Sequence, residues 1–303
     1  MYIQSATRAH QKGPLTFPPE ARALITPYLP PSITITTTTT TTQSQTQQKP
    51  REYPHVTLTY AHSLDASLAL APGIRTVLSG PESKAMTHFL RAHHDAILVG
   101  AGTAVADDPG LNSRLLPDPD LEAAGERQRQ RQRQPRPVVL DPKGRWAVHE
   151  GSKVVRIARE GKGLGPWVLV ADNKGHGTGV VDEGRRRVVE EVGGRYIPLE
   201  ARAEGERFEW VDVLGLLKRE GLESVMIEGG GEVINSLLAP PGNGLVDSVI
   251  VTIAPTWLGQ GGVVVSPPRT VGEDGQPGQP VRLTGVTWCP LGEDVVLCGR
   301  IPR

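Results

Sequence analysis

Short apolar runs recur along the chain and predict the strands of a sheet. Residues Val56–Tyr60 alternate between apolar and polar side chains, which is the period of a strand. Four further runs have the continuous apolar character of strands that are buried on both faces: Ala96–Val99, Val138–Leu140, Val168–Val170 and Ser224–Ile227. Three segments near the C-terminus also resemble strands and have no helix between them: Val246–Ile253, Val281–Thr287 and Val295–Ile301.

Helical patterns stand between the earlier strands. Ser79-Gly80-Pro81-Glu82 has the features of a helix start, with a small polar residue, a proline in the first turn and an acid near the positive end of the helix dipole. Residues Val211–Glu220 and the segment after Gly231 carry apolar side chains at helical spacing. Strands that alternate with helices predict an α/β domain with a mixed, mainly parallel sheet flanked by helices, and the C-terminal strands predict an antiparallel edge.

Two polar, low-complexity segments interrupt this pattern. The threonine run Thr36–Thr42 precedes the polar tract Gln43–Pro50, and such a sequence cannot bury enough apolar surface to offset the entropy of ordering its backbone. We therefore expect residues 1–52 to form a mostly flexible arm, with a little local structure around Leu15–Leu29. A second insertion, at about 117–136, alternates arginine with glutamine. Residues 53–303 are expected to form a single domain that contains this insertion.

Composition narrows the classes of function. The chain has 303 residues with 33 basic and 33 acidic side chains, and a formal charge of zero argues against a protein that coats a nucleic-acid backbone. No apolar run approaches the roughly 18 residues of a membrane span, and Met1–His10 lacks the apolar core of a secretory signal. Two cysteines suit a reducing compartment. We therefore expect a cytoplasmic protein with neither nucleic-acid nor membrane partners.

Two strand-to-helix junctions carry residue types that bind phosphate. Glu228-Gly229-Gly230-Gly231-Glu232 follows a predicted strand directly, and glycines there let a phosphate approach the unpaired amides of a helix start. Because a tight turn alone needs one glycine rather than three, phosphate or dinucleotide contact is the favoured interpretation. In the second junction, Thr103 and Asp107 lie four residues apart and would share one face of a helix. A plain turn over Asp107–Gly110 explains the same residues equally well.

Other catalytic and metal-binding motifs are missing from the sequence. It contains neither a G-x-S-x-G nucleophile elbow nor a G-K-[ST] phosphate loop. Cys289 and Cys298 lie in strand-like surroundings, so we expect them to pack in the core. Consecutive helical residues point about 100° apart, so His93-His94-Asp95 is expected to be a polar helix terminus rather than a metal site, and we expect no metal.

Taken together, several motifs resemble the riboflavin-pathway reductase family. The resemblance covers roughly Tyr53–Ile301 and rests on residues in consistent order: Ser63-Leu64-Asp65, Arg91–Gly100, Gly102-Thr103, Ala106–Pro109, Leu111, Arg114, Val139–Pro142 and Val225–Gly230. Members of this family have a dihydrofolate-reductase-like fold, are typically homodimers, and use NADPH to reduce the ribosylamino side chain of a diaminopyrimidinone phosphate. The resemblance therefore implies NADPH as the cofactor, a phosphorylated diaminopyrimidine as the substrate and a homodimer.

The resemblance also implies roles for individual residues. Contacts to the cofactor fall on Ala61, Thr103, Asp107, Gly229, Gly230, Gly231, Glu232 and Val233. The substrate side falls on Arg91, Leu111, Arg114 and Glu228. Both arginines suit a substrate phosphate, because a guanidinium binds phosphate bidentately, although a surface salt bridge is the plainer alternative. The reaction also needs a proton donor, for which Asp65 and Glu228 are the candidates by position.

Two departures from the family pattern affect these expectations. Ala66 stands where members often carry glycine, which puts close backbone approach at that turn in question. Bacterial relatives carry a zinc deaminase domain with H-x-E and C-x-x-C motifs, and this sequence has neither, so we expect a stand-alone reductase without deaminase activity. Two alternatives remain. One is another pterin or dihydrofolate-type NADPH reductase. Such an enzyme typically has an acid in its first helix that faces the pterin, and here only Glu82, at the helix start, is available, which is a poor match. The other is RNA binding through Glu126–Gln134, which the zero net charge and the 4% aromatic content disfavour.

Overall fold

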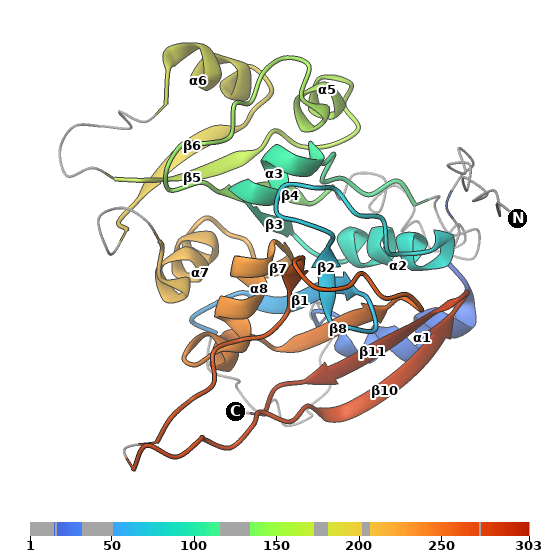
Figure 1. Ribbon diagram of the computed structural model, residues 1–303. Coiled ribbons are helices and arrows are strands. Elements are labelled where there is room, and N and C mark those ends of the chain that lie inside the picture. The colour runs from blue at the N-terminus through green and yellow to red at the C-terminus, as the bar shows by residue number, and fades with distance from the viewer. Residues whose placement is uncertain are drawn as a thin grey trace, which may run out of the picture.

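The computed structural model describes residues 15, 17–31, 51–115, 134–172, 181–201, 207–272 and 274–302. These residues form a nine-stranded sheet together with a small two-stranded ribbon and several helices (Figure 1). Most of the expected arm, and most of the expected insertion at about 117–136, lie outside the described residues. The Arg-Gln stretch is therefore not tested by the structure.

The sheet has the order β10-β11-β8-β1-β7-β3-β4-β5-β6. All strands from β8 to β6 in this order are parallel, while β11 runs antiparallel to β8 and to β10. The predicted mixed, mainly parallel sheet with an antiparallel C-terminal edge is therefore confirmed. The strands are β1 His55–His62, β3 Ala96–Gly100, β4 Arg136–Leu140, β5 Trp167–Ala171, β6 Arg195–Leu199, β7 Ser224–Gly229, β8 Ser248–Ile253, β10 Thr284–Leu291 and β11 Asp294–Arg300. The ribbon pairs β2 Ser67–Ala69 with β9 Val263–Val264.

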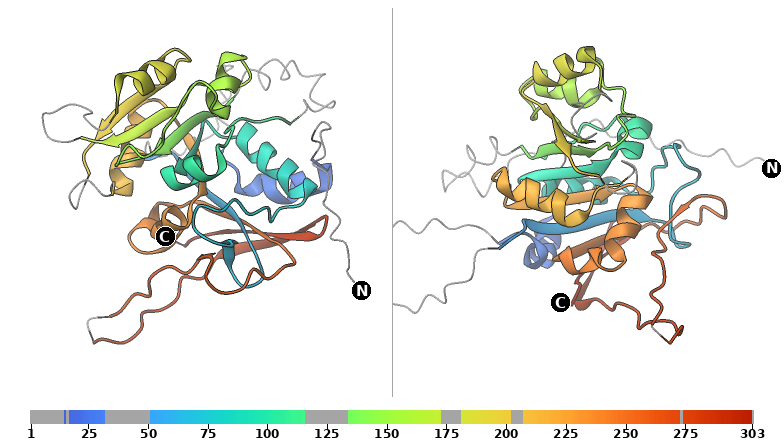
Figure 2. Two further views of the ribbon diagram at one scale, coloured as in Figure 1. Left: turned by 45° about the horizontal axis from the view of Figure 1, so that its top comes forward. Right: turned by 90° about the vertical axis from the view of Figure 1, so that its left-hand side faces the viewer.

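Helices join most of the parallel strands and pack on both faces of the sheet. They are α1 Pro19–Ile25, α2 Pro81–Ala92, α3 Ala101–Asp107, α5 Lys153–Arg159, α6 Glu183–Glu190, α7 Trp210–Arg219 and α8 Gly231–Leu238, with 3₁₀ turns η1 Thr26–Tyr28 and η3 Gly242–Leu245. Figure 2 shows the twist of the sheet from two sides and the chain after β9 projecting away from the body.

Alternating side chains of the strands explain which helices cover which face. In β3, Leu98 packs in a core cluster with residues of α7 and α8, whereas its neighbours Ile97 and Val99 pack with residues of α3, α5 and α6. A third cluster joins α1 and α2 to Met226 and Ile250 of the central strands. The strands are thus buried on both faces, as their continuous apolar runs predicted.

Part of the expected arm belongs to the folded domain. Phe17 is fully buried, and its ring lies 4.9 Å from that of Phe89 in α2. The Tyr28 hydroxyl donates to the Gly285 carbonyl, and Arg300 Nη2 donates to the Pro27 carbonyl at 2.6 Å. The expected local structure is present, but the boundary at residue 53 is wrong for residues 17–30. Helix α1 in this segment is only seven residues long, and the residues that bury it are distant in the sequence.

The remaining differences concern elements with weak patterns. Strand β10 begins and ends later than the predicted Val281–Thr287: it starts at Thr284 and continues through Pro290 to Leu291. A proline opposes strand formation in a central strand, but β10 is an edge strand, where proline is tolerated. Three further elements had no predicted counterpart, namely α5, α6 and β6, which are short and lie among polar residues.

Candidate functional site

The two glycine-containing junctions lie side by side at the carboxyl edge of the sheet. Strands β3 and β7 are parallel neighbours, so the turns that follow them meet. The Thr103 hydroxyl lies 3.4 Å from the Gly229 carbonyl oxygen, and a Cβ added to Gly230 would lie 3.2 Å from Thr103 Oγ1. The structure therefore brings Thr103 together with the glycine run, as the sequence suggested for a shared ligand.

Each glycine next to this contact also has a structural reason to be glycine. Gly229 has a φ of +104°, and a Cβ there would meet Ile234 Cδ1 at 2.7 Å. A Cβ on Gly231 would meet Val263 Cγ1 of β9 at 2.5 Å. The run of three glycines thus does not by itself require a phosphate, which weakens that part of the sequence argument.

The start of α8 gives an independent reason to expect an anion here. Gly230 precedes the helix with φ +100° and ψ 135°, and no side chain caps the helix. The first intrahelical bond runs from Ile234 N to the Gly230 carbonyl, so the amides of Gly231, Glu232 and Val233 have no partner within the helix. Three unpaired amides and the positive end of the helix dipole suit a phosphate group.

Asp107 and Asp108 separate into different roles. Asp108 has a left-handed backbone, and its Oδ1 accepts a 3.0 Å hydrogen bond from Lys153 N at the start of α5. Asp107 is half-buried, and burial raises its pKa, while the nearby cations Arg75 and Lys153 oppose that rise. The turn interpretation therefore fits Asp108, and Asp107 remains available to a ligand on the same helix as Thr103.

An ion pair ties α2 to the end of β7. Arg91 Nε and Nη2 donate to the two carboxylate oxygens of Glu228, each at 2.5 Å. Their side chains are 13% and 15% exposed, so the pair is largely removed from water. Arg91 Nη1 also donates to the Asn112 carbonyl at 3.1 Å. Both carboxylate oxygens of Glu228 are therefore engaged as acceptors, and this arrangement opposes its expected role as proton donor.

A second guanidinium stands beside this pair. Burial and then the charge of Arg91 lower the pKa of Arg114, which places the two cations near each other. Arg114 contacts His88 of α2 at three points: its backbone N lies 3.1 Å from Nδ1, and its Nε and Nη2 lie 3.3 and 3.1 Å from Nε2. Burial, Arg91 and Arg114 lower the pKa of His88 to about 3, so the imidazole is neutral.

This neutral ring makes the contact to the Arg114 guanidinium a weak one. A neutral imidazole has a single acceptor nitrogen. If His88 Nδ1 accepts from the backbone of Arg114, its Nε2 carries a hydrogen and faces another donor. The guanidinium of Arg114 thus lies against a neutral ring and forms no ion pair with the described residues, so it can turn toward a phosphate. We call Arg91, Arg114, Glu228 and His88 the arginine cluster.

Leu111 is part of the core. Its side chain is 1% exposed and packs among core residues such as Ala104 and Val139. Its φ of +47° shows that the backbone turns sharply here, between α3 and Arg114. The Leu111 side chain therefore anchors this turn, and its expected place on the substrate side stays a prediction.

Asp65 lies in the turn between β1 and β2 and holds a neighbouring loop. Its carboxylate accepts a hydrogen bond from the Ser63 hydroxyl, and bonds from the amides of Leu258 at 3.2 Å and Gly259 at 2.7 Å. These bonds, that of Ser63 first, lower the pKa of Asp65 to about 2. A carboxyl with this pKa has no proton to donate at neutral pH, so the expectation of Asp65 as the proton donor is not supported.

The same hydrogen bonds predict how stability depends on pH. The pKa of Asp65 is lower in the folded than in the unfolded state, so its contribution is present above about pH 4 and is lost as the pH falls toward 2. We expect Asp65→Asn to lower the melting temperature at pH 7, and the difference from the unaltered protein to vanish near pH 2. Thermal unfolding followed by circular dichroism measures it, with exposed Glu150→Gln as the control. A deficit independent of pH would contradict the assignment.

Ala66 keeps the glycine-type backbone at this turn although it is not a glycine. Its φ is +58°, in the left-handed region that costs a residue with a Cβ about 1–2 kcal/mol. We expect Ala66→Gly to stabilise the protein by up to about 1 kcal/mol, the relief being reduced by the greater freedom of glycine in the unfolded chain. Urea unfolding tests this, with Ala158→Gly in α5 as a control that should be destabilising. Equal losses in both variants would contradict it.

Ala61 lies near the end of β1, between the carboxyl ends of β7 and β8. It therefore shares an edge of the sheet with the glycine junction. Elsewhere, both cysteines are buried and unpaired, and His93 caps α2, as the sequence predicted. In the described part of the chain, no group of three or more His, Cys, Asp or Glu residues is placed to hold a metal. None of the described helices has the length and apolar character needed to cross a membrane.

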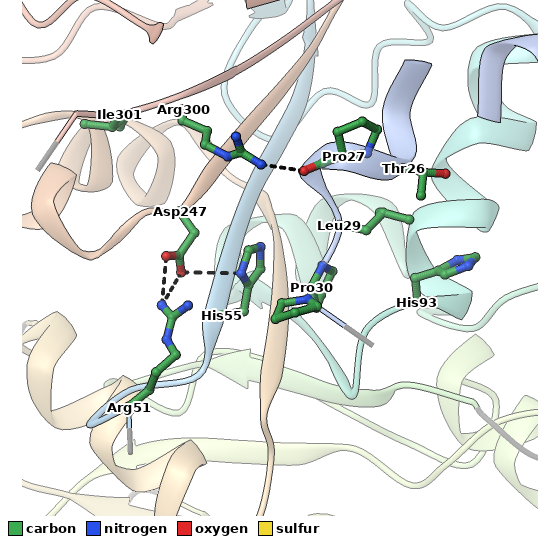
Figure 3. A pocket seen from close by; sticks show the side chains of 11 residues that line it. Thr26, Pro27, Leu29, Pro30, Arg51, His55, His93, Asp247, Arg300 and Ile301 are labelled. Carbon is green, nitrogen blue, oxygen red and sulfur yellow. Dashed lines mark hydrogen bonds and ion pairs between the residues drawn. The ribbon is translucent and has the colours of Figure 1, made fainter. Parts of the chain in front are cut away.

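A pocket of about 710 Å³ lies at the opposite end of β1 (Figure 3). There Asp247 accepts two bonds from Arg51 Nη2, at 2.8 and 2.7 Å, and one from Val56 N at 2.9 Å. Arg300 contacts the Pro27 carbonyl. These polar groups fasten the N-terminal segment to the sheet, and the pocket contains none of the expected site residues.

Sequence reasoning missed two residues of the site. His88 belongs to no recognisable motif, and the apolar pattern of α2 predicts that its position is in the core. Asn112 contributes its carbonyl to Arg91 and its side-chain amide to the Lys162 carbonyl. Both act through contacts 21 to 50 residues away in the chain, which no local pattern shows.

The chain is similar to several known proteins. The chain matches the RibD C-terminal domain family over residues 54–297. It is 43% identical over 249 residues to the 2,5-diamino-6-ribosylamino-4(3H)-pyrimidinone 5′-phosphate reductase of Eremothecium gossypii, covering 82% of this chain and 88% of that protein. The reductase of the same name from Saccharomyces cerevisiae is 38% identical over 249 residues, covering 82% and 87%.

Solved structures are also similar. A Saccharomyces cerevisiae riboflavin biosynthesis reductase superposes with a TM-score of 0.66 at 32% identity, covering 93% of this chain and all of that one. RibD from Acinetobacter baumannii gives a TM-score of 0.59 at 24% identity, covering 83% of this chain and 59% of that one, and this likeness concerns the fold alone.

Proposed function

The chain belongs to the RibD C-terminal domain family, and from this premise we propose that it reduces 2,5-diamino-6-ribosylamino-4(3H)-pyrimidinone 5′-phosphate with NADPH, a step of riboflavin biosynthesis. The observation that carries the proposal is the arginine cluster beside the glycine junction. Two guanidinium groups and one carboxylate leave a net positive charge next to an uncapped helix start. Such a site suits two phosphorylated molecules, one at the helix start and one at the arginine cluster.

On the cofactor side, the amides of Gly231, Glu232 and Val233 would hold a phosphate of NADPH, with Thr103 and Asp107 on the neighbouring helix α3 and Ala61 toward the nicotinamide half. Gly229 and Gly230 shape the backbone of this junction. Bound NADPH supplies the hydride of the reaction.

On the substrate side, Arg114 would bind the 5′-phosphate. Its guanidinium lies against neutral His88 and forms no ion pair with any of the described residues. Arg91 is held rigidly by Glu228 and Asn112, so it orients the substrate with little loss of side-chain entropy. Both oxygens of Glu228 accept from Arg91, and Asp65 has a lowered pKa and holds its loop, so we assign Glu228 to positioning Arg91 and Asp65 to holding that loop.

A direct assay tests the proposed function. Purified protein should oxidise NADPH in the presence of the diaminopyrimidinone phosphate, with consumption followed at 340 nm. NADH and dihydrofolate serve as the comparison arms for cofactor and substrate. Turnover of dihydrofolate but not of the diaminopyrimidine would overturn the proposal in favour of a pterin reductase.

Removal of the Arg114 guanidinium should act on the substrate phosphate alone. Because a hydrogen bond to a charged group contributes about 1.5–3 kcal/mol, we expect Arg114→Gln to raise the KM of the phosphorylated substrate roughly tenfold or more. The KM of NADPH and of the dephosphorylated substrate should stay unchanged. Arg156→Gln, an exposed arginine on α5, is the matched control. Equal losses with and without the substrate phosphate would contradict this role.

We also propose that the protein is a homodimer, as the resemblance implied. The edge hairpin β10–β11 exposes apolar side chains in support of it, with Trp288 at 57%, Val286 at 43% and Val295 at 36% exposure. Such a patch on an edge strand favours contact with a second copy. Sedimentation equilibrium measures the assembly, and a monomer at micromolar concentration would contradict it.

A further inference from the structure

One tryptophan of the chain has no structural role in the described residues. Four of the five tryptophans have an evident one: Trp146 is buried in the core, Trp167 lies between the guanidinium groups of Arg136 and Arg195, Trp210 donates to Ser236, and Trp288 lies on the edge hairpin. Trp257 is 73% exposed, the largest value among the exposed apolar side chains. An indole has a large apolar surface, and leaving it in water is unfavourable unless a ligand covers it.

The backbone that carries Trp257 is anchored on both sides. The loop leaves the sheet at the end of β8 and enters β9, which pairs with β2. Between these ends, the Thr256 carbonyl accepts a 2.8 Å bond from Leu64 N, and Asp65 accepts from the amides of Leu258 and Gly259. The position of Trp257 is thus fixed from both sides, which is the arrangement of a preorganised contact and not of a loose loop.

The anchored loop stands at the edge of the sheet where the reaction is proposed. Strand β1 lies between β8 and β7, and all three are parallel. The turn after β1 holds the Trp257 loop, and Glu228 with the glycine junction follows in β7. The described groups of the arginine cluster are charged or polar, so they serve the phosphate and the sugar. The flat diaminopyrimidinone ring has no partner among them.

We propose that Trp257 is a specificity-determining contact that stacks on the pyrimidinone ring of the substrate. This inference rests on the proposed function. Stacking of an aromatic side chain on a base contributes about 1–3 kcal/mol, and the ring is the part of the substrate that a sugar phosphate lacks. Leu64, which is 47% exposed, lies in the turn that is bound to this loop and is a second exposed apolar side chain at this edge.

Kinetics of matched tryptophan variants test the proposal. Trp257→Ala should raise the KM of the diaminopyrimidinone phosphate about tenfold, which is the lower part of the range for one stacked ring. The turnover number and the KM of NADPH should stay unchanged, and Trp257→Phe should restore most of the affinity. Ribose 5-phosphate, tested as a competitive inhibitor, should bind equally to the unaltered protein and to Trp257→Ala. Val271→Ala, which truncates another highly exposed apolar side chain away from both proposed surfaces, is the control.

Two results would overturn the proposal. One is an unchanged KM for the substrate in Trp257→Ala. The other is a change of oligomeric state in Trp257→Ala that accounts for the whole loss, which would make the indole a contact between copies. Fluorescence separates this proposal from the proposed function: substrate should quench the emission of Trp288→Phe but not that of Trp257→Phe. Quenching without NADPH oxidation would leave the stacking contact intact and reject the reductase reaction.

Discussion

We expect Gly230→Ala to weaken NADPH binding by about two orders of magnitude. Gly230 has φ +100° and ψ 135°, which only glycine adopts without strain, and forcing such a conformation on alanine costs about 1–3 kcal/mol. Alanine would relieve this strain by turning the peptide plane before α8. That movement takes the first amides of the helix out of line with a phosphate.

The new methyl group would also disturb the neighbouring junction. A Cβ on Gly230 would lie 3.2 Å from Thr103 Oγ1, so the hydroxyl proposed to contact the cofactor has to move. The dissociation constant of NADPH can be measured by the change in its fluorescence on binding. Urea unfolding of the same variant gives the cost in stability.

A control separates backbone strain from the loss of the site. Gly221 follows α7 with φ +82°, and nothing lies within 4 Å of a Cβ added there. Gly221→Ala should therefore lose about 1 kcal/mol of stability and bind NADPH normally. If Gly230→Ala binds NADPH as tightly as Gly221→Ala does, the glycine junction is not the phosphate site.

The ends of strands β3 and β7 could be predicted from the sequence, but the chemistry of the residues that follow them could not. The apolar run Ala96–Val99 and the run ending at Ile227 determine where β3 and β7 end, and their parallel pairing brings Thr103 to Gly229. Both facts follow from short-range periodicity and the general arrangement of parallel sheets. The site could therefore be located from the sequence, although the run of glycines overstated the evidence for phosphate.

Roles that depend on distant partners could not be inferred from local pattern. Glu228 and Asp65 were equal candidates for the proton donor because both are carboxylates near strand ends. Glu228 is engaged by Arg91, 137 residues earlier, and Asp65 by Gly259, 194 residues later. Those pairings decide what each carboxylate can contact, and they arise only when the sheet has assembled. The packing of Phe17 against Phe89 could not be predicted for the same reason, because the two residues are distant in the sequence.

We expect Glu228→Gln to lower kcat/KM about 100-fold through the position of Arg91 and not through loss of a proton. The substitution removes the charge that holds the guanidinium at two points and leaves Arg91 as a poorly compensated, largely buried cation. Breaking a buried pair from one side costs about 3–5 kcal/mol, and the partial exposure of this pair reduces that to about 2 kcal/mol. The variant should therefore lose stability and bind the substrate more weakly, with a raised KM.

A double-variant cycle distinguishes the two roles of Glu228. Removing both charges in Arg91→Gln with Glu228→Gln leaves no unpaired ion, so the combined loss of stability should be smaller than the sum of the single losses. A proton donor predicts another outcome: Glu228→Gln would be stable, would keep its KM, and would lose turnover together with one limb of the pH profile. The exposed pair Arg195–Glu220 supplies the control, since Glu220→Gln should change neither stability by more than about 1 kcal/mol nor turnover. Additive losses in the cycle, with an unchanged KM, would return Glu228 to the role of acid.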